Sequence, residues 1–280
     1  KANVDAYRRL RNTIRFMLAN LDGFGEKERI APDRMPELER YMLARLAELD
    51  GVVRQAYAGF DFGKVNSTLF NFCTNDLSAF YFDIRKDALY CDPVDAPRRR
   101  AARTVIDTIF RCIVTWYAPI LCFTMEEAWT TRFGADESVH LQDFFAAPAA
   151  WTDTALVEKW KRIRELRRVV TGALELARAD KTIGSSLEAA PVLNCGLQDS
   201  QLLSEESWKE IAITSGFKIV GDGLSRAFQL PEVPGVGVEF RKAAGDKCAR
   251  CWMVLEEVSR HPQTHLCNRC TQAVAALEPA

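Results

Sequence analysis

The sequence predicts a mainly α-helical protein in which a helical bundle is followed by a small α/β module and a C-terminal four-cysteine finger. Apolar residues recur at helical spacing over roughly the first 145 residues. Short β-like runs, separated by glycine and proline, follow residue 181. Four of the nine cysteines then lie between Cys248 and Cys270. We therefore expect a helical domain over residues 1–148, a connecting long helix with the α/β module over 149–240, and the finger over 241–280.

The composition is that of a soluble globular protein whose charges nearly cancel. The 280 residues are 48% hydrophobic, and 37 Lys and Arg face 38 Asp and Glu. Binding to an acidic polymer must therefore come from local clusters of cations and not from the net charge of −1. The other five cysteines are scattered, as in reduced cytosolic proteins. No apolar run is long enough for a membrane span, no signal peptide is recognisable, and a helical pattern that begins almost at residue 1 suggests a piece of a longer chain.

Five helical patterns occupy the first part of the chain. The first ends at Gly23 and Gly25, and the second follows Pro36, which suits a first helical turn. Apolar residues form one stripe on each helix: Tyr7, Leu10, Ile14, Met17, Leu18 and Leu21 on the first, and Leu38, Tyr41, Met42, Leu46, Leu49, Val52 and Val53 on the second. We expect both to be long amphipathic helices.

The next three helices are predicted from their ends. Asp61 is a good N-cap for the third helix, which carries apolar residues as far as Leu77. The fourth runs from Pro97 until Pro119 breaks it. Thr124 and Glu127 have the spacing of a capping box at the start of the fifth helix, and Gly134 closes it.

The second half of the chain changes its period. A heptad-like seam indicates one long helix over 151–180 that packs on a neighbour, with Leu156, Ile163, Leu166, Val170, Ala173 and Ala177 on the seam. The runs "APVLNC", "IAITSGFKIV", "SRAFQL" and "GVGVEFRKA" then read as short strands, with a helix-like stretch from Leu202 to Lys209 among them. These elements predict the α/β module.

The cysteine cluster has the spacing of a zinc site. Two Cys-x-x-Cys turns, "CARC" and "CNRC", are separated by 15 residues and contribute Cys248, Cys251, Cys267 and Cys270. Each such turn offers two thiolates to a tetrahedral zinc ion. Because the protein would fill all four positions, we expect one structural zinc and no catalytic metal. Core or redox cysteines are the disfavoured alternative, since redox pairs occur singly. His261 and His265 could compete as ligands, but we expect them to be loop residues.

Basic residues and a tryptophan accompany these cysteines: Arg241, Lys242, Lys247, Arg250, Trp252 and Arg269. A basic knuckle with an aromatic ring at its edge suits single-stranded RNA, because an unstacked base can lie on the ring while a cation neutralises phosphate. Trp252 could equally form the hydrophobic core of so small a module. The sequence leaves both interpretations of Trp252 open.

A second arginine cluster lies at the start of the fourth helix, where "PRRRAARTV" carries Arg98, Arg99, Arg100 and Arg103. Cations at a helix N-terminus are unfavourable by about 0.3–1 kcal/mol each. A phosphate site is conceivable there, but the pattern favours a solvated face. No phosphate-binding loop, paired-histidine metal motif or nucleophile elbow is present, so we assign no catalytic residue.

The order and wording of six segments resemble the C-terminal part of bacterial-type isoleucyl-tRNA synthetases, a class I aminoacyl-tRNA synthetase family. These segments are "DAYRRLRNTIRFMLANLDGF", "KVNSTLFNFCTNDLSAFYFDIRKDALYCD", "TWYAPILCFTMEEAW", "KTIGSSLEA", "CARCW" and "CNRC". The helical segments are similar in style to the valyl and leucyl relatives as well. The four-cysteine finger selects the isoleucyl family.

The resemblance implies a helical anticodon-binding bundle, a junction module and a zinc finger that reaches the anticodon loop. The four cysteines would bind zinc, Arg250 and Trp252 would face tRNA, and we add Arg241 and Lys242 as candidate RNA contacts. The family's HIGH and KMSKS signatures and its editing domain are absent from the sequence, so the ATP-dependent ligation of isoleucine is not located here. The implied partners are the anticodon stem-loop of isoleucine tRNA and the catalytic domain of the same protein. We expect a cytoplasmic monomer that does not bind membranes.

Two rival hypotheses come from other classes. The finger is also similar to that of formamidopyrimidine-type DNA glycosylases, which would make the chain a DNA-binding zinc protein. Members of that family resemble one another in an N-terminal Pro-Glu, whereas this sequence starts Lys1-Ala2. The glycosylase fold also has no place for the helical bundle. The second rival is a zinc-stabilised scaffold that contacts only protein.

Overall fold

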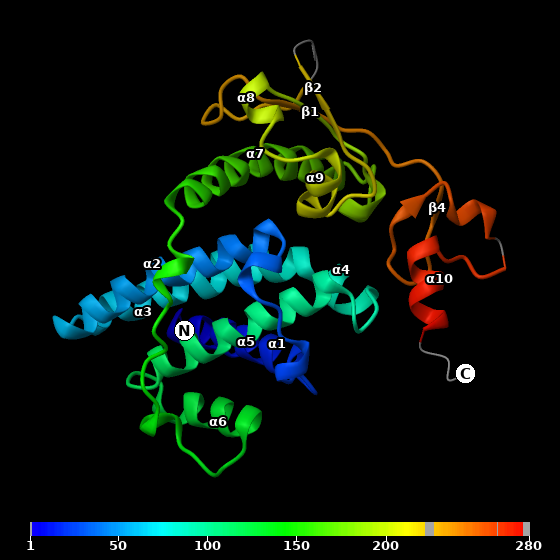
Figure 1. The fold of residues 1–280 in the computed structure, drawn as a ribbon. Coiled ribbons are helices and arrows are strands. Elements are labelled where there is room, and N and C mark those ends of the chain that lie inside the picture. Colours follow the sequence, from blue (N-terminus) through cyan, green and yellow to red (C-terminus); the bar gives the residue numbers. More distant parts are fainter. Residues whose placement is uncertain (1, 222–226, 262, 277–280) are drawn as a thin grey trace. The chain divides into compact units, whose positions relative to one another are not determined.

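The computed structural model describes residues 2–221, 227–261 and 263–276. The chain divides into two compact units, residues 1–157 and residues 158–280, which are described separately. The mainly α-helical class is confirmed, with a small amount of strand in the second unit (Figure 1). The division into three domains stays a prediction. None of the helices in the described part of the chain is long and apolar enough to cross a lipid bilayer.

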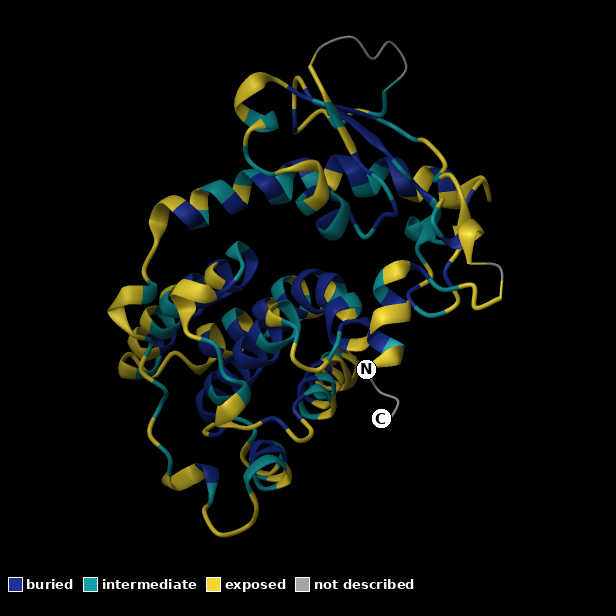
Figure 2. Cartoon of the chain, turned by 45° about the vertical axis from the view of Figure 1, so that its right-hand side comes forward, coloured by how far each residue is buried: buried dark blue, intermediate teal, exposed yellow. Residues whose placement is uncertain are grey.

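The first unit is a bundle of helices arranged around a buried central one. Its main elements are α1 (Ala2–Asn20), α2 (Glu37–Ala58), α3 (Phe62–Asn71), the π-helix η3 (Phe72–Tyr81), α4 (Phe82–Cys91), α5 (Pro97–Tyr117) and α6 (Cys122–Phe133). Short 3-10 turns lie at Glu26–Glu28, Pro32–Arg34, Val139–Leu141 and Ala149–Trp151. Every residue of α5 from Ala101 to Tyr117 is buried except Arg111, and α5 packs against α1, α2, α4 and α6 (Figure 2). An all-round buried helix of this kind is the core of the unit.

Several predicted helix ends are confirmed. The Asp61 side chain accepts a hydrogen bond from the Lys64 amide at 2.9 Å and caps α3. Pro97 opens α5, and Gly134 ends α6 with φ of +91°. Pro36 lies one position before the first turn of α2, as its N-cap residue. Each of these helix ends depends on a few neighbouring residues, so the local sequence was enough to predict it.

The capping box predicted for α6 is wrong. The helix begins at Cys122, so Thr124 and Glu127 lie inside it. Thr124 Oγ1 instead hydrogen-bonds Tyr7 Oη of α1 at 2.8 Å, and Glu127 pairs with Arg11 of α1 at 3.1 Å. Both side chains therefore join two helices that are more than 100 residues apart in sequence.

The third helix is longer than predicted because α3, η3 and α4 follow one another without a break to Cys91. The π-helical turns in the middle were not predicted. Tyr81, the last residue of η3, and Arg85 of α4 both contact Glu39 of α2 in the interior. Arg85 Nε lies 2.5 Å and Tyr81 Oη 3.0 Å from Glu39 Oε1. The Arg85 and Glu39 side chains are 1% and 0% exposed, so this is a fully buried ion pair.

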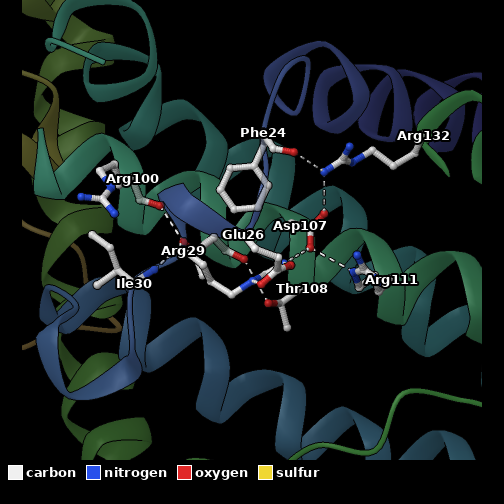
Figure 3. Close-up of polar contacts among 10 residues, drawn as sticks. Phe24, Glu26, Arg29, Ile30, Arg100, Asp107, Thr108, Arg111 and Arg132 are labelled. Atoms are coloured by element: carbon white, nitrogen blue, oxygen red, sulfur yellow. Dashed lines mark hydrogen bonds and ion pairs between the residues drawn. The ribbon is translucent and has the colours of Figure 1, made fainter. Parts of the chain in front are cut away.

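A second buried carboxylate, Asp107 of α5, holds the connection between α1 and α2 (Figure 3). Arg29, Arg111 and Arg132 donate to it at 2.8, 3.0 and 3.2 Å. Burial tends to raise the pKa of Asp107, but the hydrogen bonds and charges of these arginines prevail and lower it. The carboxylate therefore stays ionised at neutral pH and ties three segments together.

Three of the four arginines at the start of α5 bind other parts of the first unit instead of forming a solvated face. Arg98 pairs with Asp92 and Asp87 at 2.8 and 3.0 Å. Arg100 donates to the Glu28 and Lys27 carbonyls at 3.0 and 2.9 Å. Arg103 is buried and donates to the Asn20 and Asp22 carbonyls, the former at 3.0 Å. These contacts offset the unfavourable helix dipole and fix the chain that follows α1, so the prediction of a solvated face is wrong.

Most of the long helix α7 (Thr154–Ala179) belongs to the second unit, where it packs under a small sheet (Figure 1). Strand β1 (Val192–Asn194) lies in the middle, parallel to β2 (Lys218–Val220) and antiparallel to β3 (Gly237–Glu239), with Leu193 opposite Ile219 and Val238. Helices α8 (Leu197–Ser200) and α9 (Glu205–Ala212) follow β1. The finger consists of β4 (Asp246–Lys247), β5 (Val254–Leu255) and α10 (Asn268–Ala275), with 3-10 turns at Ser186–Glu188 and Val258–Arg260 completing the unit.

The predicted seam of α7 is confirmed, because all six of its residues are buried. At Gly172 an added Cβ would lie 2.6 Å from Phe228 Cε1, so this glycine admits the aromatic ring that covers the helix. Two strand assignments need correction. The first two residues of "IAITSGFKIV" belong to α9, which lies three residues later than predicted and has Ile213 as its C-cap residue at φ of +57°. Only the last three residues of the run form a strand, β2. Part of "SRAFQL" lies outside the described residues, and only Phe228 forms a bridge, with Val238.

Candidate zinc centre and its basic rim

The four cysteines come together at one point of the finger. Their sulfur atoms all lie within 4.8 Å of one another, and all four residues are buried. The β4–β5 hairpin carries Cys248 and Cys251 between its strands, while Cys267 is the N-cap residue of α10 and Cys270 lies in its first turn. Two knuckles of this kind can place four sulfurs at the corners of a tetrahedron.

Backbone geometry shapes the first knuckle. The Cys267 amide donates to Cys248 Sγ at 3.3 Å, and the Trp252 amide donates to the Cys248 carbonyl at 3.0 Å. Gly245, just before β4, has φ of +105°, and a Cβ there would lie 2.2 Å from the Leu255 carbonyl carbon. Only glycine permits this close approach of the two hairpin strands.

The electrostatics of the cluster fit a bound cation. Burial raises the pKa of Cys251 to about 12 and the pKa of Cys267 and Cys270 to about 11. Burial acts in the same direction on Cys248, but backbone N–H groups of Cys251, Cys267 and Arg250 lower its pKa to about 6. Four adjacent thiolates repel one another unless a cation lies between them, and zinc binding displaces the thiol protons. The donor set is therefore suited to one Zn²⁺.

The two histidines between the knuckles are loop residues, as predicted. His261 Nε2 lies 3.0 Å from Asn268 Oδ1, at the start of α10. The His265 carbonyl accepts a hydrogen bond from the Ala249 amide at 2.8 Å. Neither histidine belongs to the metal-ligating cluster found among the described residues. Glu257 binds the Asn268 amide at 3.0 Å and so stabilises the N-terminus of α10, a contact that no sequence pattern predicted.

The structure excludes one of the two interpretations of Trp252, that it forms the core of the finger, and leaves the RNA contact a prediction. Its side chain is 60% exposed, so it is not the core of the finger. The residue has φ of +66°, a backbone conformation that is uncommon for a residue other than glycine. Lys247 Nζ lies 5.4 Å from the centre of its ring, a cation–π contact that leaves the ring accessible.

The other three residues predicted to contact RNA are Arg250, Arg241 and Lys242, and they differ in burial and in partners. Arg250 is half-buried, with Nη1 3.7 Å from Cys270 Sγ, so its guanidinium also supports the metal-binding sulfurs. Arg241 and Lys242 are exposed in the segment between β3 and β4. Arg241 pairs with Glu239 at 2.9 Å, an exposed ion pair that is easily exchanged for another anion. The RNA contacts of these residues stay predictions.

Comparison with known proteins finds two family matches in the chain. Residues 39–193 match the family described as the anticodon-binding domain of tRNA ligase, and residues 245–273 match the zinc finger found in FPG and IleRS. The isoleucine–tRNA ligase of Ruegeria pomeroyi is 54% identical over 98% of this chain and 29% of its own length. Those of Agrobacterium fabrum and Gluconobacter oxydans are 51% and 46% identical over 94% and 99% of this chain. The chain spans less than a third of the length of these relatives.

The zinc-finger match and the four-sulfur cluster agree on the cofactor. The match covers all four cysteines, and their sulfurs have the mutual distances that one ion requires. The finger therefore has one structural zinc site, with no position left over for a substrate.

Proposed function

The chain belongs to the family of tRNA-ligase anticodon-binding domains, and on that premise we propose that it is the anticodon-recognition region of an isoleucine–tRNA ligase. The observation that carries this proposal is the joint presence of the helical family match over more than half of the chain and the finger in the same chain. The finger alone does not separate RNA from DNA, because its family includes both classes of protein. The helical match favours tRNA over duplex DNA.

The finger's proposed task is to hold a rigid platform against an exposed ribonucleotide loop. Cys248, Cys251, Cys267 and Cys270 would bind the zinc, which supplies the rigidity of the knuckles. Trp252 would stack on an unpaired base, since base–aromatic stacking contributes about 1–3 kcal/mol. Arg241, Lys242 and Arg250 would neutralise nearby phosphates.

The ligation chemistry is assigned to other parts of the same protein. As the resemblance implies, ATP-dependent activation of isoleucine and its transfer to tRNA would take place in the catalytic domain, which makes that domain the second partner of this region. We propose a cytoplasmic location, because the cysteines of the chain form no disulfide, as in a reducing compartment. The assembly that we propose is a monomer.

Anticodon recognition predicts discrimination between two otherwise identical RNAs. In filter-binding competition, isoleucine tRNA should displace a labelled copy of itself more effectively than the same tRNA with its anticodon replaced. Each mismatched contact to a base is worth about 1–3 kcal/mol, so a difference of about tenfold or more is expected. Equal competition by the two tRNAs would refute the proposal, and preferential displacement by duplex DNA would favour the glycosylase-like alternative.

Trp252→Ala is expected to weaken binding of isoleucine tRNA by about 1–3 kcal/mol while zinc stays at one atom per chain. The physical reason is that the ring is exposed and outside the metal cluster. Trp252→Phe should retain part of the affinity, since it keeps a stacking surface. Affinity and zinc content are measured on the same preparation. Loss of zinc in Trp252→Ala would show that the ring is required for folding of the finger instead.

A further inference from the structure

The outward face of α1 carries a basic hollow that the sequence pattern did not predict. Six residues of the helix line it, with a volume of about 380 Å³: Val4, Tyr7, Arg8, Arg11, Asn12 and Arg15. Their spacing of three and four residues puts them on one side of the helix. We call this set the α1 hollow.

The α1 hollow faces away from the core because the opposite side of α1 is fully committed to the bundle. Leu10, Ile14 and Met17 are each less than 5% exposed. Thr13, also buried, hydrogen-bonds Ser78 of η3 at 3.0 Å. The helix cannot rotate to bury its arginines without exposing this apolar stripe.

Positive charge in the α1 hollow is only partly compensated. Arg11 pairs with Glu127 at 3.1 Å. Arg8 reaches Asp5 at 3.7 Å, but both side chains are more than half exposed, and such pairs contribute little. Arg15 is exposed and has no ion-pair partner among the described residues. The hollow therefore carries a net positive charge on a chain whose total charge is −1.

The hollow is also held in a fixed shape. Tyr7 Oη lies 2.8 Å from Thr124 Oγ1 and accepts a hydrogen bond from Arg11 at 3.2 Å, so the ring is anchored from both sides. Arg8 and Arg15 are seven residues apart, which corresponds to about 10.5 Å along the helix. Cations at this separation can contact more than one phosphate of a single backbone, and guanidinium groups suit phosphate geometry.

We propose that the α1 hollow binds the phosphate backbone of RNA, and that this contact is separate from the contact made by the finger. The proposal rests on the proposed function, because it takes tRNA as the polyanion. Arg8 and Arg15 neutralise phosphates, Asn12 offers a further donor, and Tyr7 fixes the wall of the hollow. Contacts to phosphate position an RNA without reading its sequence.

The test compares two double variants of the full chain with the same change in charge. Arg8→Gln/Arg15→Gln removes the two exposed cations of the α1 hollow. Arg34→Gln/Arg40→Gln removes two exposed arginines elsewhere in the first unit. Affinity for isoleucine tRNA, and for the same tRNA with a replaced anticodon, is measured over a range of KCl concentrations.

The α1 variant is expected to bind both tRNAs about tenfold more weakly and to lower the salt slope by about 1.5 to 2, while the control variant changes neither quantity. Equal effects of the two variants would overturn the proposal. So would competition by polyglutamate as effective as competition by tRNA, since that outcome points to an acidic protein. If anticodon discrimination is absent from the wild type but the α1 variant still loses affinity for both RNAs, the proposed function fails and the backbone contact stands.

Discussion

Cys267→Ser is expected to abolish zinc binding and unfold the finger. Its sulfur lies 3.8 Å from Cys251 Sγ in the buried cluster, and serine is a poor ligand for zinc at neutral pH. Zinc binding to small fingers contributes about 10–16 kcal/mol, which is as large as the whole stability of an ordinary domain at about 5–15 kcal/mol. Metal analysis should therefore fall from one zinc per chain to nearly none, and the finger should become sensitive to protease.

Cys122→Ser is the matched control for this experiment. Cys122 is exposed, lies in the first unit and has no part in the cluster. It should keep one zinc per chain. If Cys267→Ser also retains one tightly bound zinc, the four-cysteine ligand set is wrong, and His261→Ala and His265→Ala in the same background would show whether a histidine had taken the vacant position.

Arg85→Met is expected to reduce the free energy of unfolding of the helical unit by about 3–5 kcal/mol. The substitution leaves the Glu39 carboxyl group in the interior, where its side chain is 0% exposed, without its main cation. Tyr81 can still donate one hydrogen bond to Glu39, but a neutral hydroxyl does not replace a guanidinium. Urea unfolding followed by helical circular dichroism measures the loss.

Two further variants separate the buried charge from other effects. Lys86→Met removes the neighbouring cation, whose pair with Asp83 is exposed, and should change stability by less than about 1 kcal/mol. The double variant Glu39→Leu/Arg85→Met removes both charges and should recover most of the stability, because apolar replacement of a buried pair is often close to neutral. A loss no larger in Arg85→Met than in Lys86→Met would contradict the importance of this ion pair.

The sequence by itself determined those features that depend on a few neighbouring residues. The spacing of apolar residues predicted helices α1, α2, α5 and α7, and the seam of α7 is buried at each predicted position. The N-cap at Asp61 and the stop at Gly134 follow from local backbone chemistry. The pairing of two Cys-x-x-Cys turns predicted the zinc centre because each turn already fixes two of its four ligands.

Only the tertiary structure decided which partner each polar side chain would take. Thr124 and Glu127 have the spacing of a cap, yet they bind Tyr7 and Arg11 from the opposite end of the unit. Arg103 could have faced solvent, but it donates hydrogen bonds to the Asn20 and Asp22 carbonyls at the end of α1 and just after it. Trp252 could have been core or surface, and in the folded finger it lies at the surface. The reason is physical: helical period and turn geometry arise within one or two turns of chain, whereas the partner of a charged or aromatic side chain depends on segments that only folding brings near.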